Sequence, residues 1–289
     1  MKKRQIIGFI GTGIMGTGMV HNLLLNEYDV NILAHKNRAP IDRLVSSGAK
    51  ELYSLKDIAR QSGIVVLCLP NSETVKLVLT KIISDLENDT LLIDCTTNSV
   101  QAVNQFQARA VSGRFRYAEA PLTGGQLQAE TAALGAIVGC ARKDFEEIKT
   151  VLGPCCQTIE RFGDIGSGAK AKLISNFLAL GTATLVVEAM KAARDCEVDW
   201  EKFYKLASQG SGHSMSLDRI APKAINGEYD SYVFSIANTL KDLSYIRDIF
   251  EAEQDYGKMA QLLFDIYQQS NSEGNGDQFL SSRLKLRDL

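Results

Sequence analysis

The sequence predicts an α/β chain whose second half is entirely helical, and three observations lead to this fold class. Short apolar runs typical of buried strands alternate with helical patterns up to about residue 159. An apolar, alanine-rich run from residue 166 to about residue 196 favours one long helix by its summed propensity. Only helical patterns follow it. We therefore expect a doubly wound N-terminal sheet, a long bridging helix and an all-α C-terminal domain.

Two domains are expected for a chain of 289 residues. The glycine-rich segment 163–168 separates the alternating pattern from the helical one, so it is the best candidate boundary. We predict a sheet domain over residues 1–164 and a helical domain over residues 165–289. The bridging helix should occupy residues 166–196 approximately.

The composition is typical of a globular protein without a strong overall charge. With 32 Lys and Arg against 34 Asp and Glu, the net charge is −2, which favours neither nucleic acid nor an anionic membrane as a partner. The apolar run at residues 6–10 is too short for a signal peptide, and no apolar stretch reaches the roughly 18 residues of a membrane helix. We therefore expect a cytoplasmic protein.

Six cysteines are present, and their spacing matches no metal site, so no metal is expected. Cys68, Cys95 and Cys140 lie in apolar strand-like runs, which is typical of buried free thiols in a reducing compartment. For the adjacent pair Cys155 and Cys156, we expect one turn residue beside one strand residue.

A glycine motif follows the first expected strand, residues 5–10. It is a G-x-G-x-x-G that consists of Gly11, Thr12, Gly13, Ile14, Met15 and Gly16. A helix and a second strand at residues 30–34 come next, which is the context that makes the motif specific. Gly11 permits the tight turn, Gly13 lets a pyrophosphate approach the backbone, and Gly16 allows close helix–strand packing. Together with the dipole of the helix, this predicts a dinucleotide-binding Rossmann domain.

The end of the second strand indicates which dinucleotide is bound. NAD-binding domains usually place Asp or Glu there to bond the ribose hydroxyl. Here Ala34 occupies the position, and the first acid is Asp42. His35, Lys36 and Arg38 instead offer basic groups suited to a 2′-phosphate. We expect NADP as the cofactor and keep NAD as the alternative; without a ligand, these residues would form only a solvated basic loop.

Three further strands are expected at residues 64–69, 91–95 and 117–120, and each ends in hydroxyl, amide or glycine residues. The candidate site residues at these strand ends are Leu69, Pro70, Thr97, Thr123, Gly124 and Gly125. Because ligands bind beyond the carboxyl ends of parallel strands, the three clusters could form one site. Each cluster alone would indicate only a turn or a helix cap.

Two more strands, at residues 135–139 and 155–159, are expected on either side of a helix at residues 143–152. Strand signals stop after residue 159. The remaining elements are helices at residues 200–208, 215–225, 234–254 and 257–269, a polar loop at residues 270–277 and a short final helix.

The bridging helix carries the best catalytic candidate. Lys172 and Asn176 are four residues apart and therefore share one helix face. A lysine held by a neighbouring amide is suited to acid–base chemistry. From spacing alone, however, Lys170 and Lys172 fit better as solvated charges near a helix start, because most lysines are surface residues. His213 is a weaker acid–base candidate, because a loop histidine needs burial and a partner to act as a catalyst.

In their order along the chain, these motifs resemble the β-hydroxyacid dehydrogenase family, which includes 3-hydroxyisobutyrate dehydrogenases and glyoxylate/succinic semialdehyde reductases. The resemblance covers essentially the whole chain. The matching segments are the cofactor signature at 8–16, Asp94-Cys95-Thr96-Thr97 for D-x-S-T, Ala120-Pro121-Leu122-Thr123-Gly124-Gly125 for A-P-V-S-G-G, Gly166-x-Gly168 with Lys172 and Asn176, and Lys241-Asp242-Leu243 for K-D-L.

The resemblance implies an NAD(P)-dependent oxidoreductase that transfers hydride between the nicotinamide and a short β-hydroxyacid or semialdehyde. It assigns proton transfer to Lys172, oriented by Asn176, and it implies a homodimer or homotetramer. The other implied site residues are Thr97 for cofactor or substrate, Thr123, Gly124 and Gly125 for the substrate carboxylate, and Lys241 beside nicotinamide and substrate. The two lysines suit a small anionic substrate.

Three departures from the family pattern are visible. Val100 replaces the Pro that often follows D-x-S-T, and Ser175 stands where the first Asn of K-x-x-N-N is usual; both bear on substrate placement. Ala34 replaces the acid of NAD-using members and again favours NADP. The related imine reductases replace the catalytic lysine, so Lys172 argues against that branch.

Two other functions stay open. The first is an NAD-dependent 3-hydroxyisobutyrate dehydrogenase, which the basic stretch at residues 35–38 disfavours. The second is a non-catalytic scaffold that binds the cofactor, which the joint presence of Lys172, Asn176 and Lys241 disfavours. The sequence does not identify the substrate.

Overall fold

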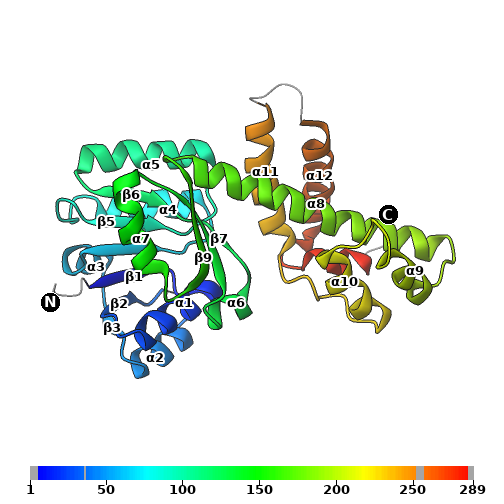
Figure 1. Ribbon diagram of the computed structural model, residues 1–289, viewed down its shortest axis with the longest axis horizontal. Coiled ribbons are helices and arrows are strands. Elements are labelled where there is room, and N and C mark those ends of the chain that lie inside the picture. The colour runs from blue at the N-terminus through cyan, green and yellow to red at the C-terminus, as the bar shows by residue number, and fades with distance from the viewer. Residues whose placement is uncertain (1–5, 36, 252–256, 286–289) are drawn as a thin grey trace. The chain divides into compact units, whose positions relative to one another are not determined.

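The computed structural model describes residues 6–35, 37–251 and 257–285, and the chain divides into two compact units, residues 1–172 and residues 173–289 (Figure 1). The long helix α8, Ser167–Asp195, begins in the first unit and ends in the second. The predicted fold class, a doubly wound sheet followed by a long helix and a helical C-terminal part, is confirmed. The expected strand start at Gln5 and the expected helix end at residues 252–254 lie outside the described residues.

One sheet forms the centre of the first unit, and its first six strands are parallel. In spatial order they are β3 (Lys50–Leu52), β2 (Val30–Leu33), β1 (Ile7–Ile10), β4 (Ile64–Leu67), β5 (Leu91–Asp94) and β6 (Arg116–Glu119). The order reverses at β1 and β4, which is the switch point beyond which open α/β sheets bind their ligands.

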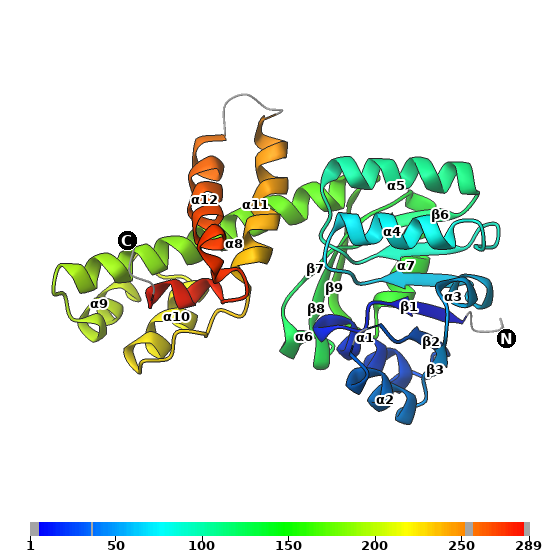
Figure 2. The same cartoon turned by 180° about the vertical axis from the view of Figure 1, so that it is seen from behind.

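Helices cover both faces of this sheet, which explains why its strands are continuous apolar runs. The helices are α1 (Ile14–Leu25), α2 (Ala39–Ser46) and α7 (Phe145–Leu152) on one face, and α3 (Leu55–Gln61), α4 (Ser72–Ile82) and α5 (Val100–Gly113) on the other (Figure 2). Successive strand residues point into different cores: Phe9 packs with α1, and Ile10 packs with the opposite set.

Beyond β6 the sheet continues with strands of mixed direction. β8 (Leu134–Gly139) pairs antiparallel with β6 and with β7 (Leu122–Thr123), and parallel with β9 (Cys156–Gly163). The short helix α6 (Gln126–Glu130) connects β7 to β8. The expectation that strand structure stops at residue 159 is wrong. β9 continues to Gly163, and its second half, residues 160–163, alternates between exposed and half-buried positions with Phe162 as its one large apolar residue, so it carries no apolar run.

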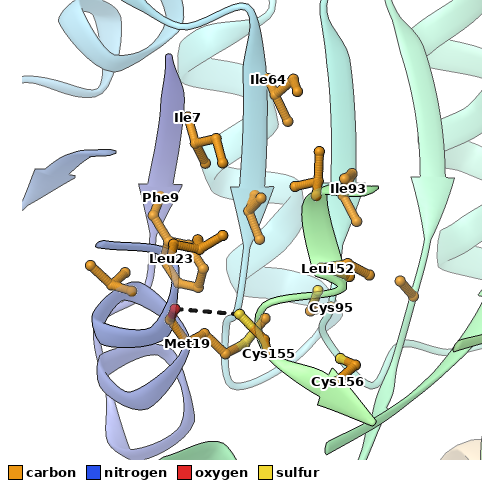
Figure 3. Close-up of a cluster of buried hydrophobic side chains, with 14 of the residues drawn as sticks. Ile7, Phe9, Met19, Leu23, Ile64, Ile93, Cys95, Leu152, Cys155 and Cys156 are labelled. Atoms are coloured by element: carbon orange, nitrogen blue, oxygen red, sulfur yellow. Dashed lines mark hydrogen bonds between the residues drawn. The ribbon is translucent and has the colours of Figure 1, made fainter. Parts of the chain in front are cut away.

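The core beneath α1 contains four of the cysteines, and Figure 3 labels Cys95, Cys155 and Cys156 among them. Cys155 lies in the turn before β9, and its Sγ is 3.4 Å from the carbonyl oxygen of Met19, while Cys156 begins the strand. Burial raises the pKa of the Cys156 thiol to about 12. All six cysteines are free, and Cys95 and Cys140 are buried as expected, whereas Cys68 is half-buried. No group of metal-binding side chains occurs among the described residues.

Helices joined by loops form the second unit. They are α9 (Trp200–Ala207), α10 (Met215–Ile225), α11 (Ile236–Glu251), α12 (Gly257–Ser270) and a 3₁₀ turn at Leu280–Leu284. Val187, Leu243 and Tyr267 are fully buried in this unit. The loop expected at residues 270–277 is in part helical, because Asn271–Asn275 forms a π-helical turn that contains Gly274 at φ 87°.

Helix α8 is apolar enough to be compared with a membrane span. An 18-residue window has a mean hydropathy of 1.6, and 39% of that window is buried inside the protein. The expectation that no stretch reaches this length and composition is therefore wrong. The core helix of a globular protein passes the same test, so membrane insertion does not follow from it.

Candidate active site

The glycine motif forms the turn between β1 and α1, and it also contains Thr12, Ile14 and Met15. Gly11 adopts φ 107°, and a Cβ there would overlap the carbonyl oxygen of Cys68, so only glycine fits. A Cβ at Gly16 would overlap the carbonyl oxygen of Gly11. A Cβ at Gly13 would instead meet no atom within 4 Å, and Gly13 starts α1 without a side-chain cap. The backbone is therefore open at this helix N-terminus, where a pyrophosphate fits.

The basic loop after β2 is part of an ion-pair network. The Arg38 Nε donates to Asp42 at 2.8 Å, and its two terminal nitrogens donate to the carboxylate of Glu51 at 2.6 and 2.8 Å. The hydrogen bond to Glu51, followed by that to Asp42, raises the pKa of Arg38 further above its ordinary value. Among the described residues these contacts use three of its five N–H donors, which leaves two for a phosphate. His35 is exposed in the same loop, and Lys36 lies outside the described residues.

A buried carboxylate organises the loop after β5. Asp94 accepts hydrogen bonds from the Thr96 N–H at 3.0 Å, the Asn98 side-chain amide at 2.8 Å and the Tyr117 hydroxyl at 3.1 Å. Burial raises the pKa of Asp94 to about 6, although these hydrogen bonds oppose the rise. The Thr96 hydroxyl in turn accepts the Leu69 N–H at 3.1 Å. The loops after β4 and β5 are therefore fastened together.

This connection brings three predicted site residues to the same edge of the sheet. Leu69 and Thr97 are half-buried there, and Pro70 is exposed. A second hydrogen bond, from the Ser99 N–H to the Ser72 hydroxyl at 3.1 Å, joins the same two loops. Two of the three polar strand-end clusters are thus joined to each other by hydrogen bonds.

The third cluster follows β6 and is shaped by its own backbone. Gly124 adopts φ 107°, and the Gly125 N–H donates to the Oε1 of Gln128 at 2.9 Å. A substrate carboxylate would have to displace the Gln128 amide to use that N–H. The segment is also held against α1, because the Asn22 side chain donates to the Ala129 carbonyl at 2.8 Å.

Thr123 is one of the residues that line a cavity of about 340 Å³ in the first unit. The lining residues come from β7, β8, β9 and the segment before β8: Thr123, Ala133, Leu134, Gly135, Ala136, Ile137, Gln157, Thr158, Glu160 and Phe162. The Thr123 hydroxyl rests against Gly135, where a Cβ would overlap it.

Lys172 lies on α8 and is only 9% exposed, whereas Lys170 is exposed. The interpretation as a solvated charge therefore fits Lys170 and not Lys172. One turn further along the same helix face stands Asn176. Burial of a lysine costs free energy of folding, so lysines are rarely buried. Buried ionisable groups are therefore found preferentially at functional sites.

Asn176 is fixed by a carboxylate of the second unit. Its side-chain amide donates to Asp242 Oδ2 at 2.7 Å, and the Lys241 amine forms an ion pair with Asp242 Oδ1 at 3.0 Å. Asp242 is 1% exposed. Lys241 is thus paired with an acid, and Asn176 presents its amide in one orientation.

Two family profiles together match nearly the whole chain. Residues 6–163 match the family described as "NAD binding domain of 6-phosphogluconate dehydrogenase", and residues 166–286 match "NAD-binding of NADP-dependent 3-hydroxyisobutyrate dehydrogenase". The chain belongs to the β-hydroxyacid dehydrogenase family. It is an NAD(P)-dependent hydroxyacid dehydrogenase similar to 3-hydroxyisobutyrate dehydrogenases.

Individual relatives agree with this assignment. A probable 3-hydroxyisobutyrate dehydrogenase of Dictyostelium discoideum is 31% identical over 222 residues, which cover 75% of this chain and 68% of the relative. A 3-hydroxyisobutyrate dehydrogenase of Drosophila melanogaster is 27% identical, and the match covers 95% of this chain and 87% of the relative. The fold is similar to that of a Mycobacterium tuberculosis 3-hydroxyisobutyrate dehydrogenase solved with L-serine, with a TM-score of 0.87 at 23% identity. The superposition covers 98% of this chain and 99% of that structure.

Three residues that organise this dehydrogenase were not among the sequence candidates. Asp94 and Asp242 stood inside the matched D-x-S-T and K-D-L segments, so the motifs contained them without showing their role. Gln128 stands three residues after Gly125, which is the local position of a capping-box glutamine. Asp94 and Asp242 act through hydrogen bonds to the distant residues Tyr117 and Asn176, which a linear pattern does not show.

His213 has a partner but is not buried. Its Nε2 is 2.8 Å from Asp218 Oδ2, and the Tyr204 hydroxyl donates to Asp218 Oδ1 at 3.1 Å. The hydrogen bond from His213 lowers the pKa of Asp218. About half of the His213 side chain is exposed, at 51%, so its geometry is that of a surface hydrogen-bond network in this dehydrogenase.

Proposed function

We propose that this dehydrogenase reduces a short, carboxylate-bearing aldehyde to a β-hydroxyacid with NADPH. The observation that carries the proposal is Lys172, a buried lysine one turn before an amide that Asp242 fixes. The bound nicotinamide would supply the hydride. Lys172 would donate a proton or a hydrogen bond to the carbonyl oxygen as it becomes an alkoxide.

The remaining residues would bind and orient the substrate. Thr123 and the Gly124 and Gly125 N–H groups would hold the carboxylate, after the Gln128 amide has left the Gly125 N–H. Thr97 would contact cofactor or substrate. Lys241 would add positive charge beside them, moderated by its pairing with Asp242.

NADP is proposed over NAD because of the loop after β2. Ala34 supplies no carboxylate for the ribose hydroxyls, and Arg38 keeps two N–H donors beyond those used by Asp42 and Glu51. Because Arg38 is exposed, salt screens its attraction for a phosphate, and the preference should be moderate in size.

An NAD-dependent 3-hydroxyisobutyrate dehydrogenase is the second candidate; the names of the relatives favour its substrate and do not state a cofactor. One experiment separates the two. The kcat/KM values for NADPH and NADH are measured with a panel of semialdehydes and with 3-hydroxyisobutyrate in the oxidative direction. A preference for NADH of about tenfold or more, equal to about 1.4 kcal/mol, would contradict the NADP proposal. No turnover with any substrate would favour the non-catalytic scaffold.

A further inference from the structure

Glu119, the last residue of β6, places a buried carboxylate against the start of α8. Its Oε1 accepts the N–H of Gly166 at 2.6 Å and of Gly168 at 2.9 Å, and its Oε2 accepts the N–H of Ala169 at 3.0 Å. Glu119 is 1% exposed. Gly166, the residue before the helix, has no side chain that could cap the helix. The Glu119 carboxylate therefore caps the helix N-terminus, as a Ser, Thr or Asp at the first position usually does.

Two glycines shape the space around this carboxylate. A Cβ at Gly139 on β8 would overlap Glu119 Oε1, and a Cβ at Gly168 would lie 2.7 Å from the Ile137 carbonyl oxygen. The strand and the first helical turn can approach the carboxylate only because both positions are glycine. A larger residue at either position would push the carboxylate away from the N–H groups.

The same helical turn leads directly to Lys172. Gly168 and Lys172 are four residues apart and share one face of α8. Because the backbone of a helix is rigid over one turn, the placement of its first turn determines where the Lys172 side chain leaves the helix.

The charge of Glu119 matters for this contact. Burial raises the pKa of Glu119 to about 7, and the three N–H donors oppose the rise, while Asp94, in register on β5, adds to it. The ionised carboxylate can accept all three N–H groups, whereas a neutral group of the same shape turns one acceptor into a donor. A neutral side chain therefore leaves at least one N–H without a partner.

We propose that Glu119 is a positioning residue for the reaction, whose carboxylate fixes the first turn of α8 and thereby sets the orientation of the Lys172 amine. This inference rests on the proposed role of Lys172 as proton donor.

Glu119→Gln, which keeps the size and removes the charge, tests the inference. With saturating aldehyde, kcat should fall about 10- to 100-fold, the scale found for misplaced catalytic groups. The Kd for NADPH should stay within about twofold, because the glycine motif is unchanged. Amide hydrogen exchange in residues 166–169 should be faster than in the wild type, which reports on the helix start without any assay of activity.

Arg116→Gln is the matched control, at the opposite end of the same strand. It removes hydrogen bonds from Arg116 to Asp144 at 3.0 Å and to Glu147 at 2.6 Å. It should lower Tm and leave kcat unchanged. Wild-type kcat in Glu119→Gln would overturn the inference, as would an equal loss of kcat in Arg116→Gln.

A double variant shows whether the effect passes through Lys172. In a Lys172→Ala background, Glu119→Gln should cause no further loss of kcat, and a further loss as large as in the wild-type background would overturn the inference. Wild-type kcat in Lys172→Ala would instead overturn the proposed function, and this inference with it. Should Glu119→Gln fail to fold, Glu119→Asp keeps the charge but is one methylene shorter. Its kcat should fall about fivefold or more at unchanged NADPH affinity, and wild-type kcat would overturn the inference.

Discussion

Replacement of Lys172 by alanine tests the proposed chemistry most directly. The side chain is 9% exposed and lies one turn before Asn176, so it is held rather than free to sample solvent. Proton donation or stabilisation of an alkoxide typically contributes about 10²- to 10⁴-fold. At 1.36 kcal/mol for each factor of ten, this corresponds to about 2.7 to 5.4 kcal/mol of activation free energy. We expect Lys172→Ala to lower kcat within that range.

The assay is oxidation of NADPH with a saturating semialdehyde, accompanied by a fluorescence titration for the Kd of NADPH. The Kd should change by no more than about threefold, because the glycine motif between β1 and α1 is a separate element. Lys170→Ala is the control. Lys170 is exposed and, two residues away, points from a different helix face, so its removal should leave kcat unchanged.

Replacement of Asn176 by alanine tests the same mechanism, and its expected loss of kcat is intermediate. In the proposed mechanism its amide would orient the lysine without donating the proton, so Asn176→Ala should lower kcat less than Lys172→Ala does. Near-wild-type turnover by Lys172→Ala at saturating aldehyde would refute the assignment, since it would show that another group supplies the proton. It would also reopen the interpretation as a non-catalytic scaffold.

Arg38→Ala should lower kcat/KM for NADPH about tenfold and leave that for NADH unchanged, measured by parallel titrations; an equal loss for both cofactors would contradict the 2′-phosphate contact. Gly18→Ala should raise the aldehyde KM, because its Cβ would lie 2.7 Å from the backbone of Ala129 and push α6 away from α1; an unchanged KM would contradict this. We also propose a homo-oligomer, supported by the exposed apolar side chains of Ile174, Leu178 and Leu185 on α8. Light scattering should show a dimer or tetramer at micromolar concentration and a smaller species for Leu178→Asp; a wild-type monomer would refute it.

The strands and the long helix could be predicted because their signals are local. The segment Ile64–Leu67 is buried on both faces and appears in the sequence as an unbroken apolar run. The segment 166–196 has a composition that only a helix suits. By contrast, β3 has three residues, of which Lys50 is exposed, and the second half of β9 alternates between exposed and half-buried positions. Their pairing with neighbouring strands decides their structure, and that pairing has no local signal.

The candidate site divides in the same way. The glycine motif could be identified because its glycines meet local conformational requirements. At Gly11, for example, the backbone adopts φ 107°, which favours glycine. Glu119 contacts residues 47 to 50 positions away in the chain, and Asp242 contacts Asn176 at a separation of 66. These long-range contacts arise from tertiary packing, which the sequence pattern does not encode. The Gly125 N–H, which was expected to bind the substrate carboxylate, instead donates to Gln128 three residues further along the chain, a local helix-capping contact.

The residues that escaped sequence reasoning share a physical character. Asp94 and Glu119 are buried carboxylates, and burial raises their pKa values to about 6 and about 7 despite three hydrogen bonds to each. Burial therefore favours the neutral form of both carboxyl groups more strongly than these hydrogen bonds favour the ionised form. Each one holds a segment with a proposed site residue, Thr97 in one case and Lys172 in the other. Because each carboxylate holds a segment that carries a proposed site residue, a measurement of kcat tests its role in the reaction more directly than a measurement of Tm does.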